Sequence, residues 1–430
     1  MDSASPESGK NEQQTRIVIL GAGFGGLFAA RRLKHADAQV MIIDRHNHHL
    51  FQPLLYQVAG AALSPSDIGW PIRSLLARQA NTRVVMAEVM DINTDEHRVV
   101  TDQGDFKYDF LVVATGAQTC YFGNQAWSRN SFDLKDLSDA IRIRERVLSN
   151  MERAETSADP AVRRRLLTFI MIGGGPTGVE MAGIIAELGK LAVAADFRNI
   201  RDEEFRVVLV EGSERLLGAF PHKLGEYAAS ELGKLGVEVK TGLMVEHIDD
   251  FGARFADGSD ESGTVIWCAG VEPTPAGRWL GIDTEKDGRI FVNDNLSVPG
   301  LPEVFVIGDL ALVRDSRGRP LPGIAPVAKQ QGRFVAGHLK ERLSGTVTGK
   351  AFKYRDFGMM ATIGRGRAVA DFKRFNTRGW LTWWIWGLSH IYFLIGRPAR
   401  LLVAIKWLFE YVTFKRGSRL ILKSPGNPDS

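Results

Sequence analysis

Two glycine-rich stretches of this chain have residue types and spacings suited to chemistry. In the first, Gly21, Gly23 and Gly26 form a GxGxxG pattern directly after the apolar run 17–20. In such a loop the first glycine permits a tight turn, the second lets backbone approach a pyrophosphate, and the third lets the next helix pack closely. The unpaired N–H groups at that helix N-terminus favour anionic phosphates. The pattern therefore predicts a dinucleotide site.

The elements that must position this loop can also be recognised. Residues 17–20 and 39–43 are apolar runs that predict two buried strands. The second strand ends in Asp44, 23 residues after Gly21, where an acid can accept hydrogen bonds from a ribose 2′-hydroxyl. Strand, loop, helix, second strand and acid in this order make a simple glycine turn improbable.

The pattern recurs once, with Gly173 as its first glycine. The expected parts are strand 166–172, glycines Gly173, Gly175 and Gly178, helix 179–188, an insertion at about 190–205, strand 206–210 and Glu211. Glu211 follows Gly173 by 38 residues, against the usual roughly 20, and the insertion explains the excess. A carboxylate there repels a 2′-phosphate, so we expect NADH rather than NADPH. Arg215 is the nearby residue that could weaken this preference.

Two further strand ends indicate how the units follow one another. Tyr108–Gly116 (YDFLVVATG) comes after the first unit, and Val304–Asp309 (VFVIGD) comes after the second. The second unit, about 166–270, is therefore inserted in the first. Within the second unit, 267–270 (WCAG) ends a strand in the way that Ala114-Thr115-Gly116 ends the strand of 108–116.

Length and composition fit a folded enzyme. At about 150 residues per domain, 430 residues predict two or three domains. A hydrophobic fraction of 44% and a charged fraction of 24% exclude a disordered chain. Two cysteines, Cys120 and Cys268, cannot form a disulfide framework. The histidines at 46, 48 and 49 are expected in loop and packing roles, so no metal site is predicted.

The net charge of +4 hides an asymmetry along the chain. Residues 351–430 hold 14 basic and four acidic residues and five of the nine tryptophans, which leaves residues 1–350 with a balance of −6. Within this tail, 379–396 carries no Lys, Arg, Asp or Glu. Its length as a helix, about 27 Å, is short of a hydrocarbon core of about 30 Å, so we expect it to lie in the membrane interface. The polar residues 1–15 do not resemble a signal peptide.

A second tail segment, 401–414, places Lys406, Glu410 and Thr413 in one narrow polar stripe of an apolar helix. The basic residues that frame it are Arg397, Arg400, Lys415, Arg416, Arg419 and Lys423. Such a helix is a membrane-interface element or a buried core or dimer helix, and we favour an anionic membrane bound through 378–423. The tail is too hydrophobic for a solvated nucleic-acid face, so no nucleic acid is expected.

With these motifs in place, the chain resembles the two-dinucleotide-binding-domain flavoproteins and, among them, the type II NADH:quinone oxidoreductases, over roughly 15–415. The resemblance rests on GAGFGG (21–26), the discriminating stretch 44–73, GGGPTGVE (173–180), IGD (307–309), GIAPVAKQQG (323–332) and the Trp-rich tail. It implies an α/β fold of two Rossmann-like domains, with the NAD domain inserted in the FAD domain and a C-terminal amphipathic helical membrane-binding region. It also implies noncovalent FAD, NADH as hydride donor, a ubiquinone or menaquinone as acceptor, and no proton pumping.

The resemblance also supplies domains and a location. The expected parts are a disordered leader (1–15), a split FAD-binding domain (16–125 and 285–350), an NADH-binding domain (126–284) and a membrane-anchoring region (351–430). The expected location is the cytoplasmic face of the bacterial inner membrane, as a peripheral protein. Part of the tail is also expected to form a homodimer interface.

Residue roles come from the same resemblance. The cofactor-binding residues implied for FAD are Gly21, Gly23, Phe24, Gly25, Gly26, Asp44, Arg45, Ala114, Thr115, Gly116, Gly308 and Asp309, with Ala325, Val327 and Ala328 on a helix near the flavin. Those implied for NADH are Gly173, Gly175, Pro176, Thr177, Gly178, Glu211 and Gly270. The implied catalytic residues are Glu180, Gln330 and Gln331.

Two of these assignments leave alternatives open. Glu180 resembles a family acid near the junction of nicotinamide, flavin and quinone, and it equally suits an acid that complements the helix dipole. The family pattern Ala-Gln-x-Ala-x-Gln has Pro326 in place of its first glutamine, and proline cannot donate a hydrogen bond to a quinone carbonyl.

Other members of the superfamily are the alternatives. A thiol–disulfide reductase would need a CxxxxC that 50–60 lacks. A sulfide:quinone oxidoreductase would need a redox pair from Cys120 and Cys268, and would not need an intact NAD site. A reductase of a small redox protein leaves the tail unexplained, and a flavoprotein that binds nucleic acid leaves the apolar runs unexplained.

Overall fold

The computed structural model describes residues 14–346, 348–395, 397–413 and 419–421, so most of the expected leader lies outside the described part. The chain forms two compact units. The first comprises Met1–His49, Trp70–Gln118 and Glu272–Asp356, and the second comprises Leu50–Gly69, Thr119–Val271 and Phe357–Ser430.

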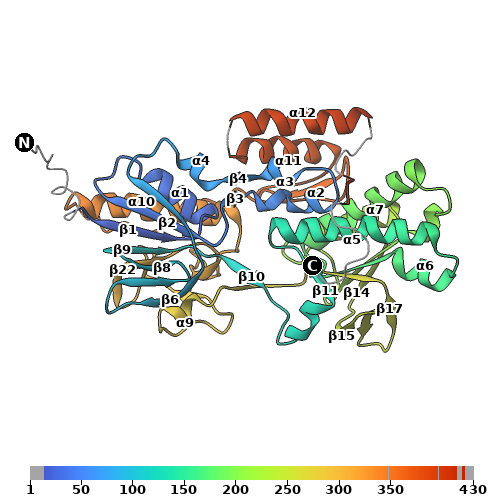
Figure 1. Ribbon diagram of the computed structural model, residues 1–430, viewed down its shortest axis with the longest axis horizontal. Helices are drawn as coiled ribbons and strands as arrows, with labels where there is room; N and C mark the ends of the chain where they lie inside the picture. Colours follow the sequence, from blue (N-terminus) through green and yellow to red (C-terminus); the bar gives the residue numbers. More distant parts are fainter. Residues whose placement is uncertain (1–13, 347, 396, 414–418, 422–430) are drawn as a thin grey trace, which may run out of the picture. The chain divides into compact units, whose positions relative to one another are not determined.

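The first unit is built on a six-stranded sheet (Figure 1). In spatial order its strands are β21 (Ser297–Val298), β22 (Leu301–Val306), β9 (Phe110–Val113), β1 (Arg16–Leu20), β2 (Gln39–Asp44) and β5 (Thr82–Met86). The last five are parallel, and β21 is antiparallel to β22. The last four residues of β1 are buried, as in a parallel strand covered on both faces.

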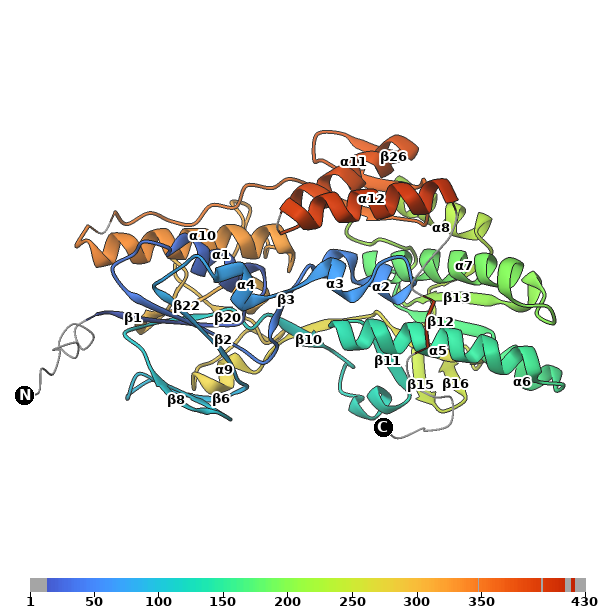
Figure 2. The ribbon, with the colours of Figure 1, turned by 45° about the horizontal axis from the view of Figure 1, so that its top comes forward.

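Helices cover one face of this sheet and a small antiparallel sheet covers the other (Figures 1 and 2). The helices are α1 (Phe24–Arg32) and α10 (Ala325–Leu343), and the strands are β6 (Val89–Asn93), β7 (Arg98–Thr101) and β8 (Gly104–Lys107). The two helices approach closely, since a Cβ on Gly332 would lie 2.1 Å from the carbonyl oxygen of Gly25. The smaller elements are α4 (Ile72–Leu76), α9 (Ala276–Trp279), β20 (Ile290–Phe291), β23 (Ala311–Leu312) and the 3₁₀ turn η4 (Gly308–Leu310).

The second unit has its own five-stranded parallel sheet. In spatial order its strands are β11 (Ser131–Asp133), β18 (Thr264–Trp267), β12 (Thr168–Ile172), β13 (Arg206–Glu211) and β14 (Val237–Thr241). An antiparallel sheet of β15 (Val245–Asp249), β16 (Gly252–Phe255) and β17 (Asp260–Ser262) shares a hydrophobic core with it. The helices are α2 (Leu55–Ala59), α3 (Pro65–Ile68), α5 (Leu137–Thr156), α6 (Pro160–Leu166), α7 (Pro176–Asp196) and α8 (His222–Lys234).

The C-terminal part of the chain, for which we expected a separate region, clusters with the second unit. It folds as β24 (Met359–Thr362), β25 (Ala368–Asp371), β26 (Asn376–Gly379), α11 (Trp380–Phe393) and α12 (Arg397–Thr413). The last two helices lie side by side over α2 and α3 (Figures 1 and 2). Within the described residues, no helix combines the length and the apolar character needed to cross a membrane.

Three predicted elements are corrected by the structure. The strand expected over 166–172 begins only at Thr168, because α6 continues to Leu166. The helix expected over 179–188 runs from Pro176 to Asp196, because proline is tolerated in a first helical turn and the buried face continues past Leu188. The insertion expected from 190 therefore begins after this helix.

Candidate functional site

The first glycine-rich loop has a conformation that only glycine fits. Gly21 has φ +92°, and a Cβ there would lie 2.4 Å from the carbonyl oxygen of Ala114. A Cβ on Gly26 would lie 1.9 Å from the carbonyl oxygen of Gly21, so the third glycine lets α1 start against the turn. These clashes give the predicted roles of the first and third glycines a steric basis.

The second loop repeats the same geometry in the other unit. Gly173 has φ +108°, and a Cβ there would lie 2.5 Å from the Cα of Ala269. A Cβ on Gly178 would lie 1.8 Å from the carbonyl oxygen of Gly173. In both loops the first glycine therefore has a positive φ, and the third glycine packs against the carbonyl oxygen of the first.

The middle glycines stand at the starts of helices with open space beside them. Gly23 is the N-cap of α1 and Gly175 is the N-cap of α7, and neither provides a side-chain cap. A Cβ on either would meet no atom within 4 Å. Each helix therefore offers its first N–H groups to a ligand, which fits a pyrophosphate in both units.

The two acids at the second strand ends are held in the same way. The backbone N–H of Ala22 donates to Asp44 Oδ2 at 2.6 Å, and that of Gly174 donates to Glu211 Oε2 at 2.5 Å. A second backbone N–H, two residues after each acid, binds the other carboxylate oxygen. Both carboxylates are thus fixed against their loops and remain partly exposed, as a ribose site requires.

Arg215 makes backbone contacts that hold it away from a phosphate-binding role. Its Nη1 donates to the Phe220 carbonyl and its Nη2 to the Gly218 carbonyl, both at 2.8 Å. The guanidinium is therefore hydrogen-bonded within its own loop. We therefore expect Arg215 to leave the predicted preference for NADH over NADPH unweakened.

The strand-end motifs of the first unit border open or polar space. Gly116 has φ +73° with nothing near its absent Cβ, and Thr115 Oγ1 lies 2.6 Å from Thr274 Oγ1. The backbone N–H of Gly308 donates to Gln331 Oε1 at 2.6 Å. Gln331 is 1% exposed, and its Nε2 has no partner among the described residues. A buried donor beside the Gly308–Asp309 motif fits an acceptor atom of bound FAD.

The two glutamines of α10 have different surroundings. Gln330 clamps a neighbouring segment, since its Nε2 donates to the Arg355 carbonyl and its Oε1 accepts from the Arg355 N–H, both at 2.9 Å. Pro326 lies in the first turn of α10, and Ala325 and Val327 flank it. Ala328 packs its methyl group 3.6 Å from where a Cβ on Gly308 would be.

Glu180 lies on α7 and is partly buried. Desolvation raises the pKa of its carboxyl to about 8, although a hydrogen bond from the Thr362 N–H to Oε1, 3.3 Å long, acts in the opposite direction. Such a carboxyl keeps its proton at neutral pH. A perturbed acid on the helix that starts at a dinucleotide loop is a candidate for a functional role.

The remaining predicted residues have these positions. Phe24 contacts the His49 ring edge to face at 5.2 Å, and His49 is buried with Nδ1 2.7 Å from the Ala22 carbonyl. Arg45 is exposed, as are Pro176 and Thr177 in the first turn of α7, and Gly270 adjoins Phe122. In the described part of the chain, no group of three His, Cys, Asp or Glu side chains could hold a metal ion.

Cys268 is unsuited to redox chemistry. Burial raises the pKa of its thiol to about 12, and the reactive form of cysteine is the thiolate. A sulfide:quinone mechanism that depends on a pair with Cys120 therefore lacks support in this structure.

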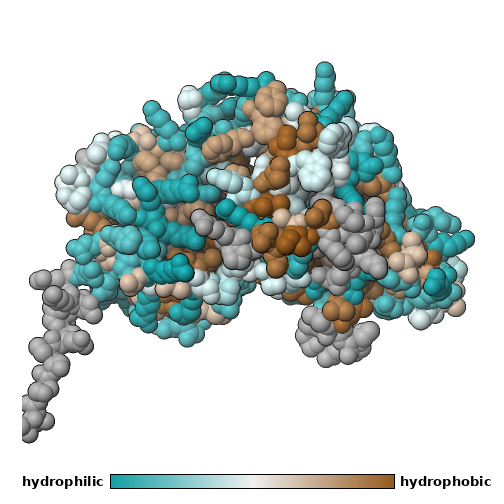
Figure 3. All heavy atoms as spheres, turned by 90° about the horizontal axis from the view of Figure 1, so that it is seen from above, coloured by the Kyte–Doolittle hydropathy of each residue, from teal (hydrophilic) through white to brown (hydrophobic). Residues whose placement is uncertain are grey.

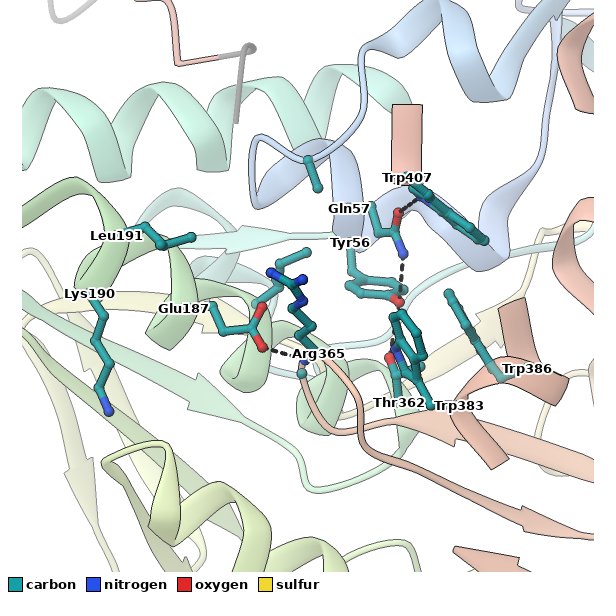
Figure 4. Close-up of a pocket in the computed structure, with 13 residues that line it drawn as sticks. Tyr56, Gln57, Glu187, Lys190, Leu191, Thr362, Arg365, Trp383, Trp386 and Trp407 are labelled. Atoms are coloured by element: carbon teal, nitrogen blue, oxygen red, sulfur yellow. Dashed lines mark hydrogen bonds between the residues drawn. The ribbon is translucent and has the colours of Figure 1, made fainter. Parts of the chain in front are cut away.

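Sequence reasoning missed a cavity of about 270 Å³ in the second unit (Figure 4). Its lining includes Tyr56, Gln57, Thr362 and Trp407. The signal that could have pointed to it is the stretch 44–73, which stood out as discriminating although no chemistry was assigned to 50–69.

The tail has an inner and an outer face. Lys406 Nζ lies 2.6 Å from Asp67 Oδ1, and Trp407 is 4% exposed. The predicted stripe therefore has its lysine engaged inward, while the side chains of Glu410 and Thr413 lie outside the described residues, as do those of four of the six framing basic residues. Figure 3 shows hydrophobic side chains gathered on the face that carries α11 and α12. The exposed ones are Trp380, Leu381, Trp384, Leu388, Tyr392, Phe393, Leu401, Leu402, Ile405 and Leu408.

Comparison with known proteins adds the following. The family model described as pyridine nucleotide-disulphide oxidoreductase matches residues 15–332. The type II NADH:quinone oxidoreductases Ndh and NdhA of Mycobacterium tuberculosis are 39% and 38% identical, over 94% of this chain and 90% and 89% of theirs. The NDH2 of Plasmodium falciparum in complex with NADH has the same fold, with a TM-score of 0.87 and 19% identity over 96% of this chain and 100% of that one.

Proposed function

We infer the roles of the two glycine-rich loops from the family to which this chain belongs, the type II NADH:quinone oxidoreductases. The Gly21 loop binds FAD, and the Gly173 loop binds NADH. The chain is an FAD-dependent enzyme that oxidises NADH and reduces a quinone. The observation that supports both sites best is the pair of equivalent loops, each with an open helix N-terminus and a strand-end acid.

FAD, when bound, supplies the two-electron chemistry between NADH and quinone. On the protein side, the start of α1 binds the pyrophosphate and Asp44 binds the ribose. The Gln331 amide accepts the Gly308 N–H, and its buried Nε2, which has no partner among the described residues, would donate to an acceptor atom of the cofactor. Thr115, Gly116 and Asp309 border the remaining part of that site.

Glu211 selects the nucleotide and Glu180 holds a proton. The fixed Glu211 carboxylate accepts hydrogen bonds from a 2′-hydroxyl and repels a 2′-phosphate, which favours NADH over NADPH. Quinone reduction takes up two protons, and a carboxyl with a pKa of about 8 is protonated at neutral pH. We therefore assign Glu180 a role in turnover as a proton-holding group.

The outer face of α11 and α12 binds an anionic membrane surface in this proposal. Trp380, Leu388 and Tyr392 are each about two-thirds exposed, at 67%, 65% and 68%. A patch of this kind is rare on a soluble monomer and marks a membrane or protein interface. Tryptophan and tyrosine suit the level of the lipid headgroups, where a quinone is also available. The expected setting is peripheral, on the cytoplasmic face of the bacterial inner membrane, with a homodimer as the alternative use of part of this face.

The function is tested with purified protein under anaerobic conditions. NADH should bleach the absorbance of the bound flavin, and a short-chain quinone should restore it. The flavin released by denaturation should be FAD. Bleaching by NADPH alone, or no reoxidation by quinone, would refute the proposal.

A further inference from the structure

The proposed function assigns no role to the segment 50–69. It contains α2 and α3 and belongs to the second unit, together with α7 and the C-terminal helices. Its side chains occupy the space between α12 and β24, where a run of hydrogen bonds crosses the unit (Figure 4).

This run links α12 to Glu180 through four contacts. Trp407 Nε1 donates to Gln57 Oε1 at 2.9 Å, and Gln57 Nε2 donates to Tyr56 Oη at 3.1 Å. Tyr56 Oη lies 3.0 Å from Thr362 Oγ1. The backbone N–H of Thr362 then donates to Glu180 Oε1 at 3.3 Å. The peptide N–H that contacts the Glu180 carboxyl therefore belongs to a residue whose side chain is held by Tyr56.

The four side chains of this run are shielded from water. Tyr56, Gln57, Thr362 and Trp407 are 5%, 7%, 3% and 4% exposed. When such a buried polar group loses its protein partner, a desolvation cost remains. Each contact therefore constrains its neighbours more than a surface hydrogen bond would.

Close packing around Glu180 leaves little freedom for other arrangements. One turn along α7, a Cβ on Gly183 would lie 2.8 Å from the backbone nitrogen of Gly364. A Cβ on Gly60 would lie 2.4 Å from Ile184 Cγ1. The end of α2 and the turn after β24 thus both pack against the turn of α7 that follows Glu180.

We propose that Tyr56 is a positioning residue for Glu180, acting through Thr362, and that Gln57 and Trp407 hold the Tyr56 hydroxyl in place. The inference rests on the proposed role of Glu180 in turnover. In this scheme the inner face of α12 helps to position Glu180, whereas its outer face binds the membrane. Tyr56 does not need to touch a substrate in this scheme.

The test compares variants that remove one hydrogen bond with matched variants that remove none. Tyr56→Phe deletes the linking hydroxyl. Tyr108→Phe is its control, because the buried Tyr108 hydroxyl has no partner among the described residues. Trp407→Phe deletes the linking indole N–H. Trp386→Phe is its control in the same cavity, because Trp386 Nε1 has no hydrogen-bond partner in the described part and a phenyl ring keeps an aromatic neighbour for Trp407, on which Trp386 stacks at 5.5 Å.

Steady-state NADH oxidation with a short-chain quinone separates the outcomes. Tyr56→Phe and Trp407→Phe should lower kcat about 3- to 10-fold, the effect of one lost hydrogen bond, with the KM for NADH unchanged. Both controls should match the wild type. In a Glu180→Gln background, Tyr56→Phe should lower kcat no further.

Three results would overturn the inference. The first is that Tyr56→Phe lowers kcat equally in the wild-type and the Glu180→Gln backgrounds. The second is that Trp386→Phe lowers kcat as much as Trp407→Phe does. The third is that Glu180→Gln retains the kcat of the wild type. An inactive wild type would instead refute the proposed function. The two failures are therefore distinct.

Discussion

Glu211, at the end of β13, accepts a hydrogen bond of 2.5 Å from the backbone N–H of Gly174, which lies in the loop after the neighbouring strand β12. Carboxylate and loop are therefore fixed together before a nucleotide arrives. Coenzyme choice should follow from the charge of this one group, because Arg215 is engaged with backbone carbonyls.

Glu211→Gln should move coenzyme preference toward NADPH. The amide keeps the size of the side chain but no longer repels a 2′-phosphate, so the ratio of kcat/KM for NADPH to that for NADH should rise about 10-fold or more. Glu214→Gln, an exposed neighbour, is the matched control and should leave the ratio unchanged. An unchanged ratio in Glu211→Gln would exclude this residue as the selector.

Gln331→Met should weaken FAD retention. The substitution leaves the Gly308 N–H without its acceptor and removes the buried Nε2 that we assign to the cofactor. A loss of about 1–3 kcal/mol corresponds to roughly 5- to 150-fold weaker binding, measured by titrating FAD into the apoprotein. Gln330→Met, on the same helix but directed at Arg355, should retain FAD like the wild type.

Glu180→Gln should stabilise the protein at alkaline pH. The folded pKa, about 8, is raised above the ordinary value of 4.5, so wild-type stability is fully present below pH 4.5 and is lost as pH rises toward 8. The variant lacks this loss, and its free energy of unfolding should exceed that of the wild type by about 1–3 kcal/mol at pH 8. The difference should vanish near pH 4. Glu152→Gln, exposed on α5, is the matched control.

Lys406→Met should destabilise the second unit, because it leaves the Asp67 carboxylate, 1% exposed, without its cation. The expected cost is about 2–4 kcal/mol in denaturant unfolding, and Asp67→Asn in the same chain should recover most of it. Lys353→Met, an exposed lysine, serves as the control. Equal stability of the single variant and the wild type would show that the ion pair contributes little.

Leu388→Glu should weaken binding to vesicles that contain anionic lipid. Burying one leucine is worth about 1.5–3 kcal/mol, so the loss should be at least roughly 10-fold in cosedimentation, with NADH oxidation by a soluble acceptor retained. Met90→Glu, which changes an apolar residue on β6 that is 58% exposed against 65% for Leu388, should bind vesicles like the wild type. Equal binding by both variants would contradict the assignment of the outer face.

The elements that sequence could identify are those whose signal is local. The Gly21 and Gly173 loops, with their strands and acids, lie within about 40 residues each, and their patterns have steric causes that recur in any Rossmann unit. Helix bounds were less accurate where apolar periodicity continued beyond the motif, as in α7, which ends at Asp196.

The contacts around Glu180 could not be predicted for a physical reason. Trp407 and Gln57 are 350 residues apart in the chain, and Tyr56 and Thr362 are 306 apart. No periodicity or spacing rule connects such positions, because tertiary packing alone brings them together. The same applies to Lys406, because the polar stripe of its helix did not indicate Asp67, 339 residues away in the chain, as its partner.

The two faces of α12 have a consequence for protein engineering. Truncation before α11 would remove Lys406 and Trp407 and leave Asp67 and Gln57 uncovered, so a shortened chain should fold and turn over poorly. A form with a less hydrophobic surface is better sought by replacing the outer side chains, such as Trp384, Leu388 and Ile405, with polar ones. The inner side chains should stay as they are, since they pack inside the second unit rather than on its exposed apolar face.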